Sequence, residues 1–430
     1  MSESSKKRRK WPIIVGTALL TTFVILLFLN LQGGKNHIHY TVPHQVAVED
    51  PAFLRYMGIL LGPTILGGNH VTDLQNGDEI FPAMIEGIRS AKKTITFETY
   101  IYWSGDIGRQ FADALVERAD AGVKVHVLLD WVGSNKIEQE YLDALEEAGA
   151  EVELYRPLHW YHLTRMNNRT HRKLLVVDGQ VGFIGGVGIA DSWLGNAETP
   201  EQWRDSHYRI EGPAVAQMQA AFVDNWIKTR AQLLIGEAYF PEIPARGNSL
   251  AQVFKSSRSG GSESVRLMYL LSIASAVKSI RLQAAYFVPD DLTIRTLVDA
   301  TQRGVHVEII VPGPHTDTQL VKNASRSRWK PLLEAGVKIY TFQPAKYHCK
   351  VLIVDNLWVS VGSTNFDDRS FRLNDEANLN IYDAEFALEQ ARIFEQDISK
   401  SRLVTLEEFD DRPIYGKIMD WVAGLFRSQL

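Results

Sequence analysis

Two short stretches of the chain carry the same three reactive residue types at the same spacing. The first reads HRKLLVVD and the second, in the C-terminal half, reads HCKVLIVD. Each has His, then Lys two positions later, then Asp five positions after the Lys. The residues are His171, Lys173 and Asp178 in the first stretch, and His348, Lys350 and Asp355 in the second. Coincidence is a poor explanation, because average residue frequencies would produce two such copies in about one chain in a thousand or fewer.

This combination of residues suits the transfer of a phosphate ester. Residues two apart on a β-strand face the same side, roughly 6.7 Å from one another, so each His projects together with its Lys. An imidazole with an ordinary pKa of about 6.5 is mostly neutral, and therefore nucleophilic, at about pH 7. If both pairs meet at one phosphorus atom, one His can form a covalent phosphohistidine while the other moves the proton of the alcohol. The two Lys would then stabilise the phosphate charge in place of metal ions.

Composition narrows the kinds of site and partner. No other stretch has the spacing of a metal site, and the single cysteine, Cys349, excludes a cysteine-cluster site and an intrachain disulfide. We therefore expect no metal and no cofactor. The net charge of −5 gives no reason to expect a nucleic-acid partner, for which a basic domain would be usual.

The two Asp residues of the stretches have two open interpretations. Asp178 precedes Gly179 and Asp355 precedes Asn356, and both pairs are typical of a hairpin turn between two strands. The Asp residues are therefore either part of the catalytic group or structural residues of the turns.

The segments that must position these residues also occur twice, in the same order. Each alternates an apolar or β-branched strand with a helical pattern that ends at Gly. The matched pairs are 92–106 with 277–291, 121–130 with 303–313, and 148–157 with 335–344. The pattern predicts an α/β fold of two tandem repeats, each with a largely parallel mixed sheet flanked by helices. A pseudo-twofold relation between the repeats would bring both motifs to one cleft.

The N-terminus is expected to be a membrane anchor. Five basic residues at 6–10 precede the uncharged segment Trp11–Leu31, which as a helix would be roughly 31 Å long. A cleaved signal peptide is the alternative, but the apolar run is long and no small-x-small cleavage site follows it. The basic cluster predicts a cytoplasmic N-terminus, and hence a catalytic part on the outer side of the membrane.

The expected domain organisation follows from these features. It comprises a basic tail at 1–10, a transmembrane helix at 11–31, a linker at 32–57, a first repeat at 58–253, a Ser/Gly-rich linker at 254–264 and a second repeat at 265–430. The C-terminal segment Ile414–Phe426 has apolar residues at helical spacing. We expect it to pack on the second repeat, with an interfacial position in lipid as the alternative.

The twin motif and its flanks resemble the phospholipase D superfamily, and within it the bacterial cardiolipin synthase branch. The resemblance covers nearly all of the chain after about Gly58. It is carried by the two motif stretches and by FETYIY, WRDSHYRIEGPAV, AAYFVPDD and GSTNFDDRSFRLNDE. It implies two phospholipase D-like domains whose active centre contains His171, Lys173, His348 and Lys350.

The resemblance also implies roles for four further residues. Ser363 and Asn365 match a polar pair that contacts phosphate, and Asp205 and Glu376 match acidic residues that orient the active histidines. A carboxylate on one imidazole nitrogen fixes the tautomer and stabilises imidazolium. Without the resemblance, Asp205 and Glu376 read equally well as surface acids.

One feature departs from the family pattern. After the first motif the chain reads GGVGIAD, with Gly185 and Gly186 where the general signature would have Ser and Asn. Gly188 stands where many cardiolipin synthases have Asn. The first half therefore offers fewer polar side chains to phosphate, for which backbone amides or glycine flexibility would have to compensate. By analogy, His171 is expected to be the nucleophile and His348 the acid and base.

The function implied by the resemblance is that of a membrane-bound phosphatidyltransferase. It would make cardiolipin from two phosphatidylglycerol molecules, or from one and another phospholipid, through a phosphohistidine, at the inner membrane of a bacterial cell. The alternatives are a phospholipase D that uses water, a nuclease of the same superfamily, which the anchor and the acidic charge disfavour, and a non-catalytic membrane scaffold. The second headgroup and the oligomeric state stay open.

Overall fold

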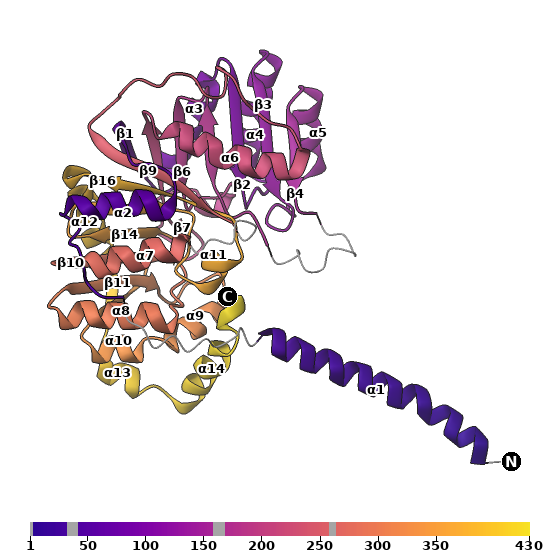
Figure 1. Cartoon of the computed structure of the whole chain (residues 1–430). Helices are drawn as coiled ribbons and strands as arrows, with labels where there is room; N and C mark the ends of the chain where they lie inside the picture. The colour runs from indigo at the N-terminus through magenta and orange to yellow at the C-terminus, as the bar shows by residue number, and fades with distance from the viewer. Residues whose placement is uncertain (1–2, 32–41, 158–167, 258–263) are drawn as a thin grey trace.

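A continuous sheet of 15 strands runs through the body of the protein, and helices cover both of its faces (Figure 1). The computed structural model describes residues 3–31, 42–157, 168–257 and 264–430. Two further short strands pair with each other outside the large sheet.

The strands of the N-terminal half are β1 (Leu66–Gln75), β2 (Thr94–Thr99), β3 (Lys124–Asp130), β4 (Glu151–Tyr155), β5 (Leu174–Val177), β6 (Val181–Gly185), β7 (Trp203–Arg204) and β8 (Ser206–Glu211). Those that follow are β9 (Ser249–Ser256), β10 (Ser279–Ala284), β11 (His306–Pro312), β12 (Lys338–Phe342), β13 (Lys346–Tyr347), β14 (Lys350–Val354), β15 (Trp358–Gly362), β16 (Glu376–Tyr382) and β17 (Ser401–Val404).

The helices of the N-terminal half are α1 (Glu3–Leu31), α2 (Pro51–Leu61), α3 (Asn76–Ser90), α4 (Asp106–Asp120), α5 (Gln139–Glu147), the 3-10 turn η2 (Asp191–Trp193) and α6 (Val215–Arg230). Those that follow are α7 (Ser264–Ser275), α8 (Asp291–Gln302), α9 (Gln319–Arg326), α10 (Lys330–Glu334), α11 (Asp368–Arg372), α12 (Ala384–Ser399), α13 (Leu406–Asp410), α14 (Ile414–Gly424) and the 3-10 turn η4 (Arg427–Gln429).

The strand order repeats in the two halves. From one outer edge inwards it runs β4, β3, β2, β5, β6, β8, β1, and from the other it runs β17, β12, β11, β10, β14, β15, β16, β9. Strands β1 and β9 pair in the middle and join the halves. Apart from β17 the two orders correspond strand for strand, which fits the duplication expected from the sequence.

The sheet is mixed, and the expectation that it is largely parallel was wrong. Parallel pairing is confined to β2, β3 and β4 in one half and to β10, β11 and β12 in the other. The other neighbours in the large sheet run antiparallel, because the motif strands turn back in the hairpins β5–β6 and β14–β15.

Local sequence explains how these elements begin and end. Every residue of β2, β5 and β14 is buried, as expected of strands that have helices on both faces. Helices α4, α5, α8 and α10 are followed by Gly122, Gly149, Gly304 and Gly336, which have φ between 84° and 92°. Glycine adopts this left-handed conformation without steric cost, so the predicted helix–Gly–strand units are confirmed.

The two halves also share one hydrophobic core. Apolar side chains from β5, β6 and β8 lie in the same cluster as those from β14, β15 and β16, with Leu174, Ile184, Val351 and Leu379 among them. This shared packing holds the two motif hairpins in a fixed relation.

Helix α1 projects away from the body, and apolar side chains such as Trp11, Leu19 and Phe23 are exposed on it (Figure 1). No helix in the described part of the chain is both long enough and apolar enough to cross a membrane. The expected transmembrane span at 11–31 is therefore not confirmed.

Two expected linkers overlap regular elements. Residues 51–57 lie in α2, and Phe254–Ser256 lie in β9, where they pair with β16. The remaining domain boundaries stay predictions.

Candidate active site

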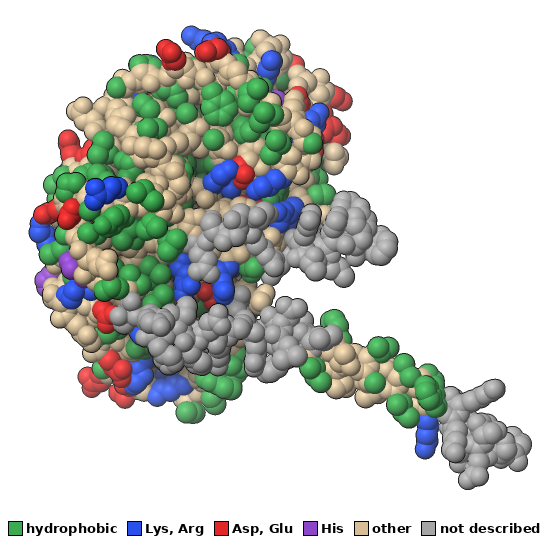
Figure 2. Space-filling model, viewed as in Figure 1, with side chains coloured by type: hydrophobic (Ala, Val, Ile, Leu, Met, Phe, Trp, Pro, Cys, Tyr) green, Lys and Arg blue, Asp and Glu red, His purple; other side chains and the backbone are tan. Residues whose placement is uncertain are grey.

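A cavity of about 480 Å³ is lined by residues from both halves of the chain, including both motif histidines. Its charged and polar wall includes Arg169, His171, Lys173, His348, Asn365 and Arg369. Lys and Arg side chains gather over the middle of the face that contains this junction (Figure 2). The two distant motifs therefore open onto one space, as the repeat predicted.

Short backbone pairings between the halves bring each His beside the other half. The N–H of His171 donates to the carbonyl of Asp375 at 2.8 Å, next to a parallel bridge between Thr170 and Asp375. In the same way, the N–H of His348 donates to the carbonyl of Arg204 at 2.8 Å, where β13 pairs with β7. The residue that follows each carbonyl is an acid, Glu376 in one case and Asp205 in the other.

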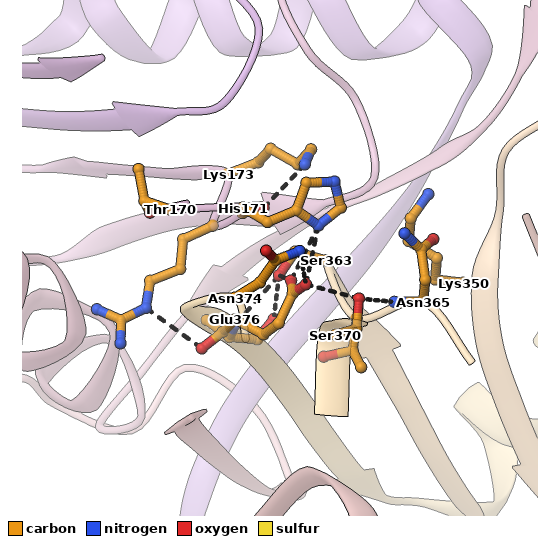
Figure 3. Close-up of polar contacts among 12 residues, drawn as sticks. Thr170, His171, Lys173, Lys350, Ser363, Asn365, Ser370, Asn374 and Glu376 are labelled. Carbon is orange, nitrogen blue, oxygen red and sulfur yellow. Dashed lines mark hydrogen bonds and ion pairs between the residues drawn. The ribbon is translucent and has the colours of Figure 1, made fainter. Parts of the chain in front are cut away.

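His171 is held by a carboxylate of the opposite half. Its Nδ1 lies 3.0 Å from both carboxylate oxygens of Glu376 (Figure 3). Burial lowers the pKa of His171 to about 4, while the Glu376 carboxylate opposes this shift. His171 is thus neutral at about pH 7, and Glu376 directs the ring so that Nε2 is the nitrogen left for chemistry.

The Glu376 carboxylate is fully buried and held by a set of donors. The hydroxyl of Ser363 donates to it at 2.5 Å and that of Ser370 at 2.8 Å, and the Asn374 amide approaches at 3.4 Å (Figure 3). Burial disfavours its charge, but His171 and these donors hold the pKa of Glu376 below its ordinary value.

His348 has the matching arrangement with Asp205. Its Nδ1 lies 2.6 Å from Oδ2 of Asp205, which also accepts from the indole N–H of Trp193 at 3.1 Å. Burial and the neighbouring Lys350 lower the pKa of His348. His348 and Lys350 also keep Asp205 ionised, although burial opposes this, so the pKa of Asp205 lies below its usual range.

Lys173 and Lys350 each contact the histidine of their own motif. Nζ of Lys173 donates to the carbonyl of His171 at 2.8 Å, and Nζ of Lys350 lies 3.0 Å from Nδ1 of His348. Burial, opposed by Glu376, lowers the pKa of Lys173 to about 7, and burial likewise lowers the pKa of Lys350. A phosphate anion that arrives in the cavity would favour their charged forms, because its negative charge compensates for the hydration lost on burial.

Asp178 and Asp355 lie in the turns that join β5 to β6 and β14 to β15. Asp178 accepts the N–H groups of residues 92–94, and Asp355 accepts those of residues 277–279. Neither lines the cavity. The structure therefore favours the structural interpretation of both Asp residues over the catalytic one.

Ser363 and Asn365 were both expected to contact phosphate, but only Asn365 faces the cavity in the structure. Asn365 lines the cavity, and its Oδ1 has no partner among the described residues. The hydroxyl of Ser363 instead points to Glu376, and Ser363 is absent from the cavity wall (Figure 3). In this structure Ser363 contacts Glu376 and not the cavity.

Close steric contacts explain why glycine occupies positions 186 and 188 after the first motif. The strand registers make Gly186 the counterpart of Ser363 and Asp205 the counterpart of Glu376. A Cβ at Gly186 would lie 2.2 Å from Oδ1 of Asp205, and one at Gly188 would lie 2.8 Å from the Cβ of Ile101. Asp205 has a shorter side chain than Glu376, and its carboxylate lies close to the backbone of Gly186. The first half therefore has no room for a serine at position 186.

Aromatic side chains that the sequence analysis did not single out form part of the wall. Tyr100 packs on His171 with ring centroids 5.3 Å apart, and Trp203 packs on His348 at 4.8 Å. Arg169, Arg369, Ser370 and Asn374 were also missed. Several of these lie in the stretches quoted for the family resemblance, such as FETYIY and GSTNFDDRSFRLNDE, which was the available signal.

Comparisons with known proteins agree with this geometry. A family model described as "Cardiolipin synthase, PLD-like domain" matches residues 84–226 and 269–398. Cardiolipin synthase 1 of Bacillus anthracis is 35% identical over 358 residues, which cover 81% of this chain and 70% of that protein. A cardiolipin synthase of Geobacillus kaustophilus is 32% identical, with 99% of this chain and 90% of that protein covered.

Two solved structures are similar in fold alone. The phosphatidylserine synthase of Haemophilus influenzae superimposes with a TM-score of 0.67 at 16% identity, covering 88% of this chain and all of that one. The polyphosphate kinase of Porphyromonas gingivalis gives a TM-score of 0.52 at 12% identity, covering 92% of this chain and 58% of that one.

Proposed function

The chain belongs to the cardiolipin synthase, PLD-like family, and from this we propose that it is a phosphatidyltransferase that makes cardiolipin and glycerol from two molecules of phosphatidylglycerol. The relatives that bear the name cardiolipin synthase support the product. The observation that carries the chemistry is one cavity lined by two histidines, each held by a carboxylate of the opposite half.

In the first step, Nε2 of His171 attacks the phosphorus atom of one phosphatidylglycerol. A P–N bond forms, and the bond from phosphorus to the glycerol oxygen breaks. His348 in its protonated form donates a proton to that oxygen, so glycerol leaves as a neutral alcohol. Glu376 stabilises the positive charge that develops on His171.

In the second step, a hydroxyl group of the second phosphatidylglycerol enters the cavity. His348, now neutral, accepts its proton, and the oxygen attacks phosphorus as the P–N bond breaks. His171 is restored, His348 is protonated again, and cardiolipin is released. Lys173, which lines the cavity, stabilises the charge on the phosphate oxygens in both steps, and the Asn365 amide is placed to donate to them. Lys350 lies beside His348 outside the cavity wall and adds positive charge near the site.

The site of action that we propose is the surface of a bacterial inner membrane. Helix α1 exposes Trp11, Leu19 and Leu20 by 64% to 70%, and exposed apolar surface of this kind needs an apolar environment. Anchoring through α1 would raise the concentration of lipid beside the cavity. The basic residues at 6–10, which precede the apolar segment 11–31, favour a catalytic part on the outer side.

The decisive experiment follows the fate of labelled phosphatidylglycerol in vesicles that contain the purified chain. We expect cardiolipin and glycerol in equal amounts, with no CDP-lipid added and no loss of rate in EDTA. Phosphatidic acid as the main product would instead assign the chain as a hydrolase, with water resolving the same intermediate. A chain that binds vesicles but gives neither product would be a scaffold.

The two histidines provide a matched pair of variants for the intermediate. With His348→Ala, the phosphohistidine is expected to accumulate as an acid-labile, base-stable label when the leaving alcohol is a good one, because the base for the second step is missing. With His171→Ala, no label is expected. A reversed pattern would exchange the roles of the two histidines.

A further inference from the structure

Helix α14 turns its apolar side away from the protein. Its large exposed side chains recur at helical spacing and form one stripe, with Phe426 just beyond the helix. The five most exposed, between 52% and 74%, are Ile414, Tyr415, Ile418, Trp421 and Leu425. A helix on the surface of a water-soluble domain normally shows the opposite arrangement, with the apolar stripe on the core.

The opposite side of α14, which packs on α9, is small and polar. Asp420 is buried there and accepts from Arg326 at 2.9 Å and from Arg412 at 2.6 Å. Ala423 is buried beside it, and Gly424 lies so close to Ser327 that a Cβ would approach its hydroxyl at 2.9 Å. The segment 414–426 therefore packs on the second repeat, as expected, but through ion pairs and small side chains, and its large apolar residues face outwards.

The chain leads from α14 directly to the wall of the active-site cavity. Gln429 and Leu430, five and six residues after the helix ends, line that cavity. The N–H of Arg369 donates to the carbonyl of Leu430 at 2.9 Å, and Arg369 itself lines the cavity. The exposed stripe is thus connected, through a few residues, to the wall of the cavity that a substrate must enter.

We propose that α14 lies in the surface of the lipid bilayer and holds the opening of the cavity against the lipid from which both substrates come. The occupant is a phospholipid membrane, because Trp421 and Tyr415 accompany aliphatic side chains, a composition typical of the interface between headgroups and acyl chains. This inference rests on the proposed function, since only a substrate with acyl chains has to reach the cavity from a bilayer. Hydrophobic side chains are visible at the lower edge of the body, where Figure 1 places α14 (Figure 2).

Site-directed labelling tests the position without relying on activity. The one cysteine, Cys349, is fully buried, so a cysteine introduced at an exposed site can be labelled selectively. A nitroxide is placed at Ile418→Cys, and at Leu388→Cys as the control, since Leu388 is 51% exposed on α12, far from α14 (Figure 1). In phosphatidylglycerol-containing vesicles, the label at 418 is expected to lie about 5–10 Å below the phosphates, more accessible to oxygen than to an aqueous nickel complex. The label at 388 is expected to stay in water.

Two results would overturn the proposal. The first is a label at 418 that remains as accessible to the aqueous complex as the label at 388. The second is a label at 418 that is already shielded without vesicles, together with a dimeric mass in solution, which would assign the stripe to a second copy of the chain.

Activity supplies a second measurement. The variant Ile418→Glu/Leu425→Glu is expected to use phosphatidylglycerol in vesicles about tenfold or more slowly, because charged side chains are costly in the apolar layer. Its rate on monomeric short-chain phosphatidylglycerol should equal that of the unaltered chain, and Leu388→Glu should leave both rates unchanged.

Equal rates of the variant and the unaltered chain on vesicles would contradict the role of α14. An unaltered chain that is inactive on both substrates would instead contradict the proposed function, while the labelling result would still decide the position of α14.

Discussion

Ser363 shows how little a residue type says about its role before its neighbours are known. Its place after the second motif predicted a phosphate contact, yet its hydroxyl donates to Glu376, and Glu376 orients His171. Asn365, from the same stretch, does line the cavity. Some polar residues of this stretch therefore hold other side chains of the site in position, and others face the cavity.

Replacing Ser363 by Ala separates these two roles. Loss of one hydrogen bond to a buried carboxylate should lower kcat about 10- to 100-fold, because His171 is held less firmly and its positive charge is less stabilised. KM for phosphatidylglycerol should change little. A rise in KM with an unchanged kcat would return Ser363 to the phosphate-binding residues, and Asn365→Ala serves as the matched variant that is expected to raise KM.

The pKa values of His171 and Lys173 predict the pH range of activity. His171 must be neutral to attack, and this form is lost as the pH falls through about 4. Lys173 must be charged to hold phosphate, and this form is lost as the pH rises through about 7. Protonated His348, which the first step needs, is also lost as the pH rises, because burial lowers its pKa. The value of kcat/KM for the purified chain should therefore fall on both sides of this window.

The variant Lys173→Arg tests the alkaline limb. Arginine keeps its charge at every accessible pH, so the decline above about pH 7 should move upwards even if the maximal rate falls. An alkaline limb that does not move would assign it to another group, such as Lys350 or His348, whose pKa values are also lowered.

At the scale of elements, the motif hairpins are the parts that carry the active residues into place. Asp178 and Asp355 each cap the start of a neighbouring strand, β2 or β10, and both have φ near 54°, which the turn requires. In each copy of the twin motif, the His lines the cavity and the Asp ties the hairpin to a neighbouring parallel strand.

Replacing Asp178 by Asn should affect stability more than catalysis. Asn tolerates the positive φ but accepts less strongly from the three N–H groups, so the free energy of unfolding should fall by about 2 kcal/mol. The rate per folded molecule should stay near that of the unaltered chain. Asp113→Asn, at an exposed position on α4, is the control expected to change neither; a catalytic loss at Asp178 without a stability loss would reverse the interpretation.

At the scale of the whole molecule, the site exists only because two halves fold against each other. His171 takes its carboxylate from β16 and His348 takes its carboxylate from just before β8. The shared core and the pairing of β1 with β9 fix these two His–carboxylate pairings between the halves of one chain. In the described part of the chain, each motif histidine is thus paired with a carboxylate of the opposite half.

Because the histidines of one cavity come from one chain, two inactive variants of the chain are expected not to complement each other. When His171→Ala and His348→Ala chains are expressed together, no activity should return, because each cavity takes both histidines from the same molecule. The measurement is the yield of cardiolipin, with co-expressed unaltered chain as the positive control. Recovery of activity in the mixture would show that cavities form between chains.

Some of these features were already determined by the sequence. Periodicity and glycine positions predicted the strand–helix units, and the spacing of His171 and Lys173, repeated at His348 and Lys350, indicated phosphoryl chemistry, since short-range geometry follows directly from strand and turn rules. The antiparallel majority of the sheet, the pairing of each histidine with the acid of the other half, the role of Ser363 and the outward stripe of α14 were decided by the tertiary structure. All four depend on contacts between segments far apart in the chain, where packing and burial, rather than local preference, determine which groups meet.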